Sequence, residues 1–299
     1  MSRAIEVHAR ATPGFEQRVA QSLLRLRQAA AQHPGRIVLT TSLGAEDMVI
    51  TDLIARHEVP IALATLDTGK LHAQTLALIP AIESRYGLTV ERWQPAAEQA
   101  IHFVKTHGNM AMRQSIDLRK ACCQIRKLEP LSRLLAGRTA WVTGLRREQS
   151  GARAEVPFAH TDSNDPKGRA KFNPLADWSW HDVWHYIASH GVPYNALHDQ
   201  LFPSIGCEPC TRAVALGEDF RAGRWWWENE DAKECGLHLS PHSAAESAAE
   251  SAHSAVLSGI VSAQAHVGAA DVKGAHAPGR SQNAKEYGLH VAHDQETSA

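Results

Sequence analysis

The chain has 299 residues, a net charge of −1 and 43% hydrophobic residues, values that suit one large globular domain or two. The near-neutral charge gives no reason to expect nucleic acid or an anionic membrane as the main partner. Runs of about 18 or more apolar residues, which would indicate a membrane span, do not occur. The first residues lack the apolar segment of a signal peptide, so we expect a reducing, cytoplasmic location in which cysteines bind metal or react.

Strand and helix patterns alternate in the first half of the chain. Apolar residues at helical spacing predict an amphipathic helix over residues 14–32, ended near Pro34 and Gly35. The patterns that follow predict a strand at 36–41, a helix to about Arg56, a strand at 61–66, a helix of about four turns and a short strand at 88–93. This alternation favours an α/β fold with a doubly wound, mainly parallel sheet and with sites at the C-terminal ends of the strands.

The middle of the chain holds a helix with two adjacent cysteines, Cys122 and Cys123. We expect this helix to break at Pro130, which would start a second short helix capped by Gly137. The next predicted strand, at 139–143, delivers a basic loop at its C-terminal end.

Further on, Ser179 has the pattern of an N-cap, with Asp182 at the third helical position, and predicts a helix through Ser189 that Gly191 ends. Beyond residue 240 the composition changes to Ala, Ser, His and Gly, which cannot bury enough apolar surface to fold. The predicted organisation is therefore an N-terminal helical segment (1–35), a nucleotide-binding domain that ends in a mobile C-terminal arm (36–240) and a disordered tail (241–299).

Four of the five cysteines form two tight pairs, Cys122 with Cys123 and Cys207 with Cys210. Four thiolates brought together make a site for a soft metal, either zinc or an iron–sulfur cluster. Adjacent thiols on one helix point in different directions, which does not suit a zinc knuckle made of two Cys-x-x-Cys pairs. A cluster with several iron corners tolerates that geometry better. Lys127 lies four residues after Cys123, on the same helical face, where it can offset the cluster's negative charge.

The fifth cysteine, Cys235, stands apart from the two pairs and is a candidate nucleophile. Gly236 beside it and the lack of apolar periodicity around it indicate a mobile arm. His238, Arg221 and Arg224 can lower its pKa and favour the thiolate.

Two loops at predicted strand ends have the composition of anion sites. Residues 42–47 hold Ser42 and Gly44 at a turn into a helix, where free amides and the helix dipole attract negative charge, although no Walker A motif is present. After the strand at 139–143, Gly144 and Leu145 are followed by Arg146 and Arg147, two guanidiniums that suit a grip on phosphate or sulfate.

These motifs together resemble the assimilatory adenylyl-sulfate (APS) reductases, relatives of the phosphoadenylyl-sulfate reductases. The resemblance runs from about residue 36 to His238. Its most specific parts are the two cysteine pairs and the Glu-Cys-Gly-Leu-His arm around Cys235.

The resemblance implies an adenine-nucleotide α-hydrolase-like fold of the PP-loop type and a 4Fe–4S cluster on the two cysteine pairs. It also implies a reaction of sulfate assimilation and cysteine biosynthesis. In this reaction Cys235 attacks the sulfur of APS, AMP leaves, and thioredoxin or glutaredoxin releases sulfite from the S-sulfocysteine. Leu66 would hold the adenine through its backbone. The residues implied to contact the phosphosulfate or to orient the arm are Lys127, Arg146, Arg147, Arg221, Arg224 and His238.

Three other functions stay open on the sequence alone. Phosphoadenylyl-sulfate would be an alternative or second substrate of the same site. An ATP-using PP-loop enzyme with a structural four-cysteine zinc site is more distant, because the loop at 42–47 lacks the second serine of the ATP pyrophosphatase motif. The third is a non-catalytic redox- or nucleotide-sensing module, in which Cys235 only forms a mixed disulfide.

The tail contains a copy of the arm. Residues 285–290 repeat residues 233–238 with one change, because Tyr287 stands where the arm has Cys235. An inert duplication explains the copy most simply. A tethered decoy that competes with the arm is the other hypothesis, since a flexible linker keeps the copy at a high effective concentration.

Overall fold

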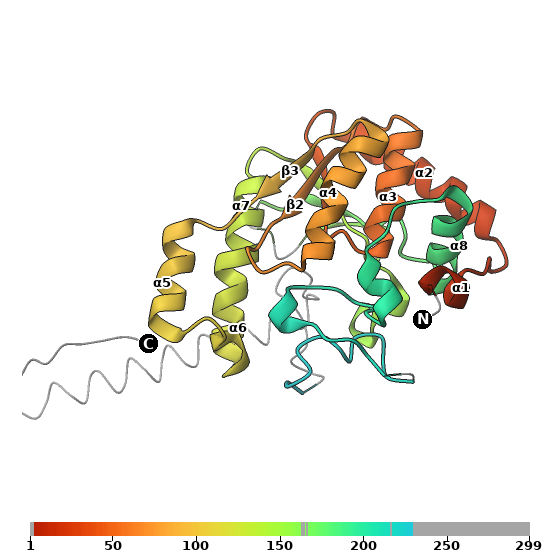
Figure 1. Ribbon diagram of the computed structural model, residues 1–299. Coiled ribbons are helices and arrows are strands. Elements are labelled where there is room, and N and C mark those ends of the chain that lie inside the picture. The colour runs from red at the N-terminus through yellow and green to blue at the C-terminus, as the bar shows by residue number, and fades with distance from the viewer. Residues whose placement is uncertain (1–2, 163–164, 166, 216, 230–299) are drawn as a thin grey trace, which may run out of the picture. The chain divides into compact units, whose positions relative to one another are not determined.

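The computed structural model describes residues 3–162, 165, 167–215 and 217–229. A six-stranded sheet in the order β3-β2-β1-β4-β6-β5 forms the centre of this part (Figure 1). The strands are β1 (Ile37–Thr41), β2 (Ala62–Leu66), β3 (Val90–Trp93), β4 (Ala140–Val142), β5 (Ala159–Thr161) and β6 (Ala170–Phe172). All neighbouring strands are parallel except β5, which is antiparallel to β6. The predicted mainly parallel, doubly wound α/β sheet is thereby confirmed.

Helices connect and cover these strands. The α-helices are α1 (Ala4–His8), α2 (Phe15–Gln32), α3 (Ala45–Arg56), α4 (Ala73–Tyr86), α5 (Ala97–His107), α6 (Ile116–Cys123), α7 (Glu129–Leu135) and α8 (Trp180–His190). A π-helical turn, η2 (Gln124–Leu128), joins α6 to α7. The 3-10 turns are η1 (Ala111–Arg113), η3 (Arg147–Gln149), η4 (Gly151–Arg153), η5 (Ala196–Gln200) and η6 (Glu208–Cys210).

Helices cover both faces of the sheet, so the fold has three layers, with the sheet between two layers of helices. On one face, Leu39 and Leu63 pack with buried residues of α2, α3, α4 and α8 in the main core. On the other face, Val38 and Trp141 pack against leucines of α7. A parallel sheet needs this double cover, and its strands accordingly read as short, nearly continuous apolar runs.

The N-terminal segment contributes to the main core. Phe15 and Leu26 of α2 and Ala4 of α1 are buried there, so residues 3–35 complete the layer that also holds α8. The boundary expected at residue 240 lies outside the described residues, as do Cys235, His238 and the tail copy around Tyr287. Within the described part, no helix is both long and apolar enough to cross a membrane.

Local sequence determines helix α8 as predicted. The Ser179 side chain accepts a hydrogen bond from the Asp182 amide at 3.0 Å, and the Asp182 carboxylate accepts one from the Ser179 amide at 3.1 Å. This capping box satisfies two amides that the first turn leaves free. At the other end, Gly191 adopts a left-handed conformation, with φ 58°, and closes the helix.

The expected break of the cysteine-bearing helix at Pro130 is wrong. Helical backbone runs on from Cys123 through the π turn η2 into α7, and Figure 1 shows α6 and α7 as one continuous coil. A proline lacks an amide hydrogen and its ring collides with the carbonyl four residues earlier. The wider π turn just before Pro130 relieves that collision, so the helix changes its hydrogen bonding without ending. Pro130 does lie in the first turn of a second short helix, as predicted.

Helix α5 and strands β5 and β6 are among the elements that were not predicted from the sequence. Helix α5 has one buried residue, Phe103, and lies beside the α6–α7 coil (Figure 1). Strands β5 and β6 are three residues long each, too short for a periodic pattern to reveal.

Candidate functional site

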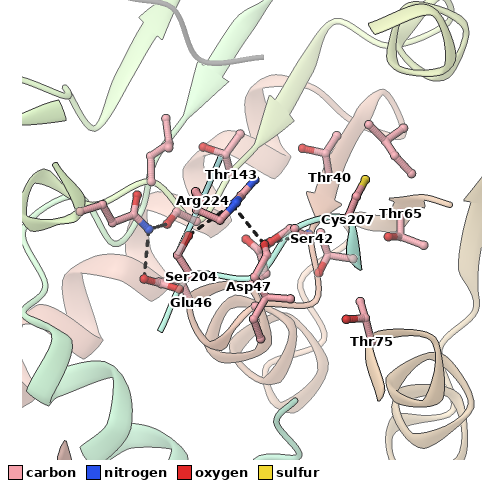
Figure 2. Close-up of a pocket in the computed structure, with 18 of the residues that line it drawn as sticks. Thr40, Ser42, Glu46, Asp47, Thr65, Thr75, Thr143, Ser204, Cys207 and Arg224 are labelled. Carbon is pink, nitrogen blue, oxygen red and sulfur yellow. Dashed lines mark hydrogen bonds between the residues drawn. The ribbon is translucent and has the colours of Figure 1, made fainter. Parts of the chain in front are cut away.

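A pocket of about 200 Å³ opens where β1, β2 and β4 end. Its walls come from the loops that follow these strands and from the later segment 203–207 and 220–225. Figure 2 shows Thr40 and Thr65 from the strand ends around the same space as Ser204 and Arg224. The predicted site residues that line it are Ser42, Gly44, Leu66, Lys127, Gly144, Arg221 and Arg224. The pocket thus lies at the C-terminal ends of the strands, where the sequence predicted a site.

The loop between β1 and α3 forms the floor of the pocket. Leu43 adopts a left-handed conformation with φ 61°, although it has a side chain, and packing buries that side chain completely. Such backbone strain persists only where the surrounding structure fixes it, and it is common at functional loops. Gly44 then forms the N-cap of α3, so the amides of the first turn of a twelve-residue helix face the pocket.

Asp47 holds this loop in place. Its carboxylate accepts hydrogen bonds from the amide and the hydroxyl of Ser42, both at 2.6 Å. Burial raises the pKa of Asp47 to about 6 despite these hydrogen bonds from Ser42. Asp47 ends the loop motif, and the sequence pattern alone predicts no role for it.

Gly144 brings the loop after β4 against Asp47. A Cβ atom at position 144 would lie 2.4 Å from Oδ1 of Asp47 and 3.0 Å from Cβ of Glu46. The first distance is shorter than such atoms approach in real structures and the second is very tight, so a side chain at position 144 would force the two loops apart. This close approach explains the glycine that precedes Leu145 and the two arginines.

We expect Gly144→Ala to lower the free energy of unfolding by about 1–3 kcal/mol, because the added methyl forces α3 and the β4 loop apart. It should also weaken nucleotide binding, since the same movement displaces the floor of the pocket. Urea denaturation of the full-length protein measures the first effect. The matched control is Gly151→Ala on the same loop, where an added Cβ meets nothing within 4 Å. Equal behaviour of the two variants would contradict the steric account.

The sequence suggested that Arg146 and Arg147 grip an anion, and in the structure both side chains contact other parts of the protein. The Arg146 side chain is 1% exposed and pairs with the Glu46 carboxylate at 2.9 Å, while the Arg147 guanidinium donates to the Val156 carbonyl at 3.0 Å. Neither residue lines the pocket. A buried guanidinium costs several kcal/mol in lost hydration, about 3–5 kcal/mol when its partner is removed, so Arg146 stays with Glu46. These adjacent arginines look alike in the sequence, but in the structure Arg146 is buried and Arg147 is only partly buried, and both have partners within the protein.

Unlike Arg146 and Arg147, Arg153 of the same loop lines the pocket, and the sequence did not predict this. It is buried in the turn η4 and lines the pocket. Its Nη1 donates to Oε1 of Gln149 at 2.7 Å, and Gln149 lines the pocket as well. The feature that could have indicated Arg153 is its position in the loop after β4, a few residues beyond Arg146 and Arg147.

Three further cationic residues, Lys127, Arg221 and Arg224, line the pocket. Arg221 and Arg224 are buried and line the pocket, and Nη1 of Arg224 donates to the Ser204 hydroxyl at 3.2 Å. Arg224 also stacks over the Trp225 ring, 4.7 Å from its centroid. Lys127 lines both this pocket and the cavity among the cysteines, so it lies between the two.

The two cysteine pairs meet across the fold, as the sequence predicted. Cys122 and Cys123 end α6, Cys207 and Cys210 flank the turn η6, and all four line one small cavity. All four are buried free thiols. The Thr68 hydroxyl lies 3.2 Å from Sγ of Cys207.

Cations surround this cavity of thiols. Lys70, Arg119, Arg126 and Lys127 line it together with the cysteines. The Arg126 guanidinium is fixed by a hydrogen bond to the Thr68 carbonyl at 2.7 Å. Burial raises the pKa of Cys210 to about 11, and it raises the pKa of Cys122 as well.

The donor set can be tested against a metal group. Within the described residues, no three His, Cys, Asp or Glu side chains converge closely enough to hold a single metal ion. Tetrahedral zinc would need thiolates about 3.8 Å apart, given a Zn–S distance of about 2.3 Å. Four buried thiols around one cavity, ringed by cations, fit the wider donor set of an iron–sulfur cluster, so the residues present suit that group chemically.

A mainly parallel sheet with a helix N-terminus at its strand ends is typical of α/β nucleotide-binding proteins of the adenine-nucleotide α-hydrolase-like type. A solved structure with the same fold is similar to this chain: the crystal structure of phosphoadenylyl-sulfate (PAPS) reductase from Candida auris, in a phosphate complex. It is 28% identical in sequence, covers 69% of this chain and 98% of its own, and superposes with a TM-score of 0.55.

Residues 36–213 match the phosphoadenosine phosphosulfate reductase domain family. Two curated relatives are named adenosine 5′-phosphosulfate reductase. The protein from Allochromatium vinosum is 56% identical over 68% of this chain and 78% of its own length. The protein from Neisseria meningitidis serogroup A is 54% identical over 72% of this chain and 87% of its own length. The chain therefore belongs to the phosphoadenosine phosphosulfate reductase family, as the motifs predicted, and is an oxidoreductase that acts on sulfur.

Proposed function

We propose that the protein reduces adenylyl sulfate (APS) to sulfite and AMP in sulfate assimilation. The observation that carries this proposal is the 54–56% identity to relatives named adenosine 5′-phosphosulfate reductase, over most of their length. The solved phosphoadenylyl-sulfate reductase is only 28% identical, which favours APS over its 3′-phosphorylated counterpart. The pocket supports a nucleotide ligand, since a helix N-terminus and several cations line it.

Each wall of the pocket has a part in the proposed binding. Ser42 and Gly44 present loop groups to the anionic portion, with Asp47 holding the loop in place. Leu66, at the end of β2, offers its backbone to the adenine. The cations proposed to bind the anionic portion are Arg153 of the loop after β4 together with Lys127, Arg221 and Arg224.

The proposed reaction uses Cys235 as the nucleophile. Its thiolate attacks the sulfur of APS, a sulfur–sulfur bond forms, and the bond from sulfur to the bridging oxygen breaks with its electron pair left on AMP. The cations of the pocket stabilise the negative charge that grows on the departing phosphate. A thiol of thioredoxin or glutaredoxin then attacks Sγ of the S-sulfocysteine, and sulfite departs. A second thiol of the reductant restores the Cys235 thiol, so two electrons come from the reductant. His238 and Arg224 are proposed to keep Cys235 ionised and oriented.

The cysteine cavity is proposed to hold a 4Fe–4S cluster on Cys122, Cys123, Cys207 and Cys210. When bound, it supplies a fixed centre of negative charge beside the pocket, and it carries no electrons in this scheme. Lys127 lies between the cavity and the pocket, where its ammonium is placed to serve both anions.

We expect kcat/KM for APS to exceed that for phosphoadenylyl-sulfate by about tenfold or more, the size of effect that a pocket produces when one ligand carries an extra charged group it does not match. Sulfite release with thioredoxin, measured under the same conditions for both nucleotides, checks this. A preference for the 3′-phosphorylated nucleotide would contradict the choice of substrate. Absence of turnover with either one would favour the sensing module that the sequence left open.

A further inference from the structure

The Gln149 side chain hydrogen-bonds to four groups, three in its own loop after β4 and one, Glu46, on α3. Its Oε1 accepts from the Arg146 amide at 3.2 Å and from Nη1 of Arg153 at 2.7 Å. Its Nε2 donates to Oε1 of Glu46 at 3.0 Å and to the Gly144 carbonyl at 3.2 Å. A carboxamide has two donor hydrogens and two acceptor lone pairs, so these four contacts use all of its capacity.

The partners also fix which way this amide points. Glu46 and the Gly144 carbonyl can only accept, whereas the Arg146 amide and the Arg153 guanidinium can only donate. A flipped amide would place its NH₂ group against two donors and its oxygen against a carboxylate. Only an amide provides a donating end and an accepting end at this distance, and a glutamate would set a second carboxylate 3.0 Å from Glu46.

Gln149 is thereby anchored at one end by Glu46 and contacts the buried Arg153 guanidinium at the other. Glu46 is fixed by its buried ion pair with Arg146 at 2.9 Å. Arg153 has a long side chain with many rotamers, and its charge acts on a ligand only where the guanidinium is held. The contact with Oε1 of Gln149 aims that guanidinium along the wall of the pocket, which both residues line.

We propose that Gln149 is a positioning residue that holds Arg153 against the phosphate of a bound adenine nucleotide. The choice of ligand rests on the proposed function. The buried ion pair of Glu46 with Arg146 anchors Gln149 in this arrangement. In this proposal the loop after β4 contacts the phosphate through Arg153, which lies four residues after Gln149 in the sequence.

The test is direct binding of AMP and of adenosine to the full-length protein by titration calorimetry. Only AMP carries the phosphate, so the ratio of the two affinities reports the anion contact alone. Arg153→Leu should weaken AMP binding about tenfold, the effect of one hydrogen bond to a charged group, and leave adenosine binding unchanged. Gln149→Leu should do the same. Gln17→Leu, on an exposed part of α2, is the matched control and should change neither affinity.

The double variant Gln149→Leu with Arg153→Leu separates positioning from a merely structural role. If Gln149 acts through Arg153, the second substitution adds almost nothing to the first. Losses that multiply, or an equal loss of adenosine binding, would overturn the proposal. So would unchanged AMP binding in Arg153→Leu. If Gln149→Leu does not fold, Gln149→Asn carries the same expectation, because its shorter amide does not span from Glu46 to Arg153. Failure of APS turnover with these binding results intact would overturn the proposed function and leave this inference standing.

Discussion

Replacement of Cys235 by serine is expected to abolish sulfite release while AMP binding is retained. A serine hydroxyl has a far higher pKa than a thiol and is a weak nucleophile unless a base activates it. Loss of a nucleophile lowers turnover by many orders of magnitude, about 10⁶-fold in a well-studied protease. We therefore expect activity to fall below about 10⁻⁴ of the wild-type value. The measurement is thioredoxin-dependent sulfite production from APS.

Mass spectrometry should identify the intermediate in the same experiment. Wild-type protein mixed with APS, without a reductant, should gain one sulfonate on Cys235, and the Cys235→Ser protein should gain none. Tyr287→Ser, at the equivalent position of the tail copy, is the matched control and should lose no activity. A sulfonate on another cysteine, or undiminished turnover of Cys235→Ser, would refute the assignment of the nucleophile.

Protein purified without oxygen is expected to be brown and to contain about four iron atoms per chain. The reason is the set of four buried free thiols around one cation-ringed cavity. Cys122→Ser and Cys207→Ser each remove one donor and should lose most of the iron. They should also lower the melting temperature, because a group that binds only the folded state stabilises it.

Cys235→Ser is the control for these two variants, because position 235 is separated in sequence from both cysteine pairs and the variant should keep its iron. The two sets of variants then separate metal binding from nucleophilic attack. Colourless protein with one zinc ion per chain would contradict the cluster. Iron loss in Cys235→Ser would show that the fifth cysteine belongs to the metal site.

Much of the fold was predictable because local patterns report the strands and the caps. Short apolar runs marked β1 and β2, and the Ser179 cap with Gly191 marked both ends of α8. Strands β5 and β6 gave no pattern, because three residues are too few to show a period. The π turn before Pro130 also escaped prediction, since tertiary packing decides whether a helix ends at a proline or changes its hydrogen bonding.

In the candidate site, too, some features were predictable from the sequence and others were not. The pairs of Cys122 with Cys123 and of Cys207 with Cys210 could be read from spacing alone, and four soft ligands in two close pairs predicted one shared site. Arg146 and Arg153 could not be told apart, because both are arginines in one loop after a strand. Burial separates them: the first lies against Glu46 at 2.9 Å, and the second lines the pocket.

The sequence by itself determined the α/β class, the family, and the cysteines that carry the proposed chemistry. Those features depend on residue type and on spacing along the chain. Only the tertiary structure decided which charged groups face the pocket, that Asp47 and Gly144 meet at a contact too close for any side chain, and that Gln149 links the loop to Arg153. Such choices depend on burial and on distances between segments up to 100 residues apart, as between Glu46 and Arg146, and no local pattern records them.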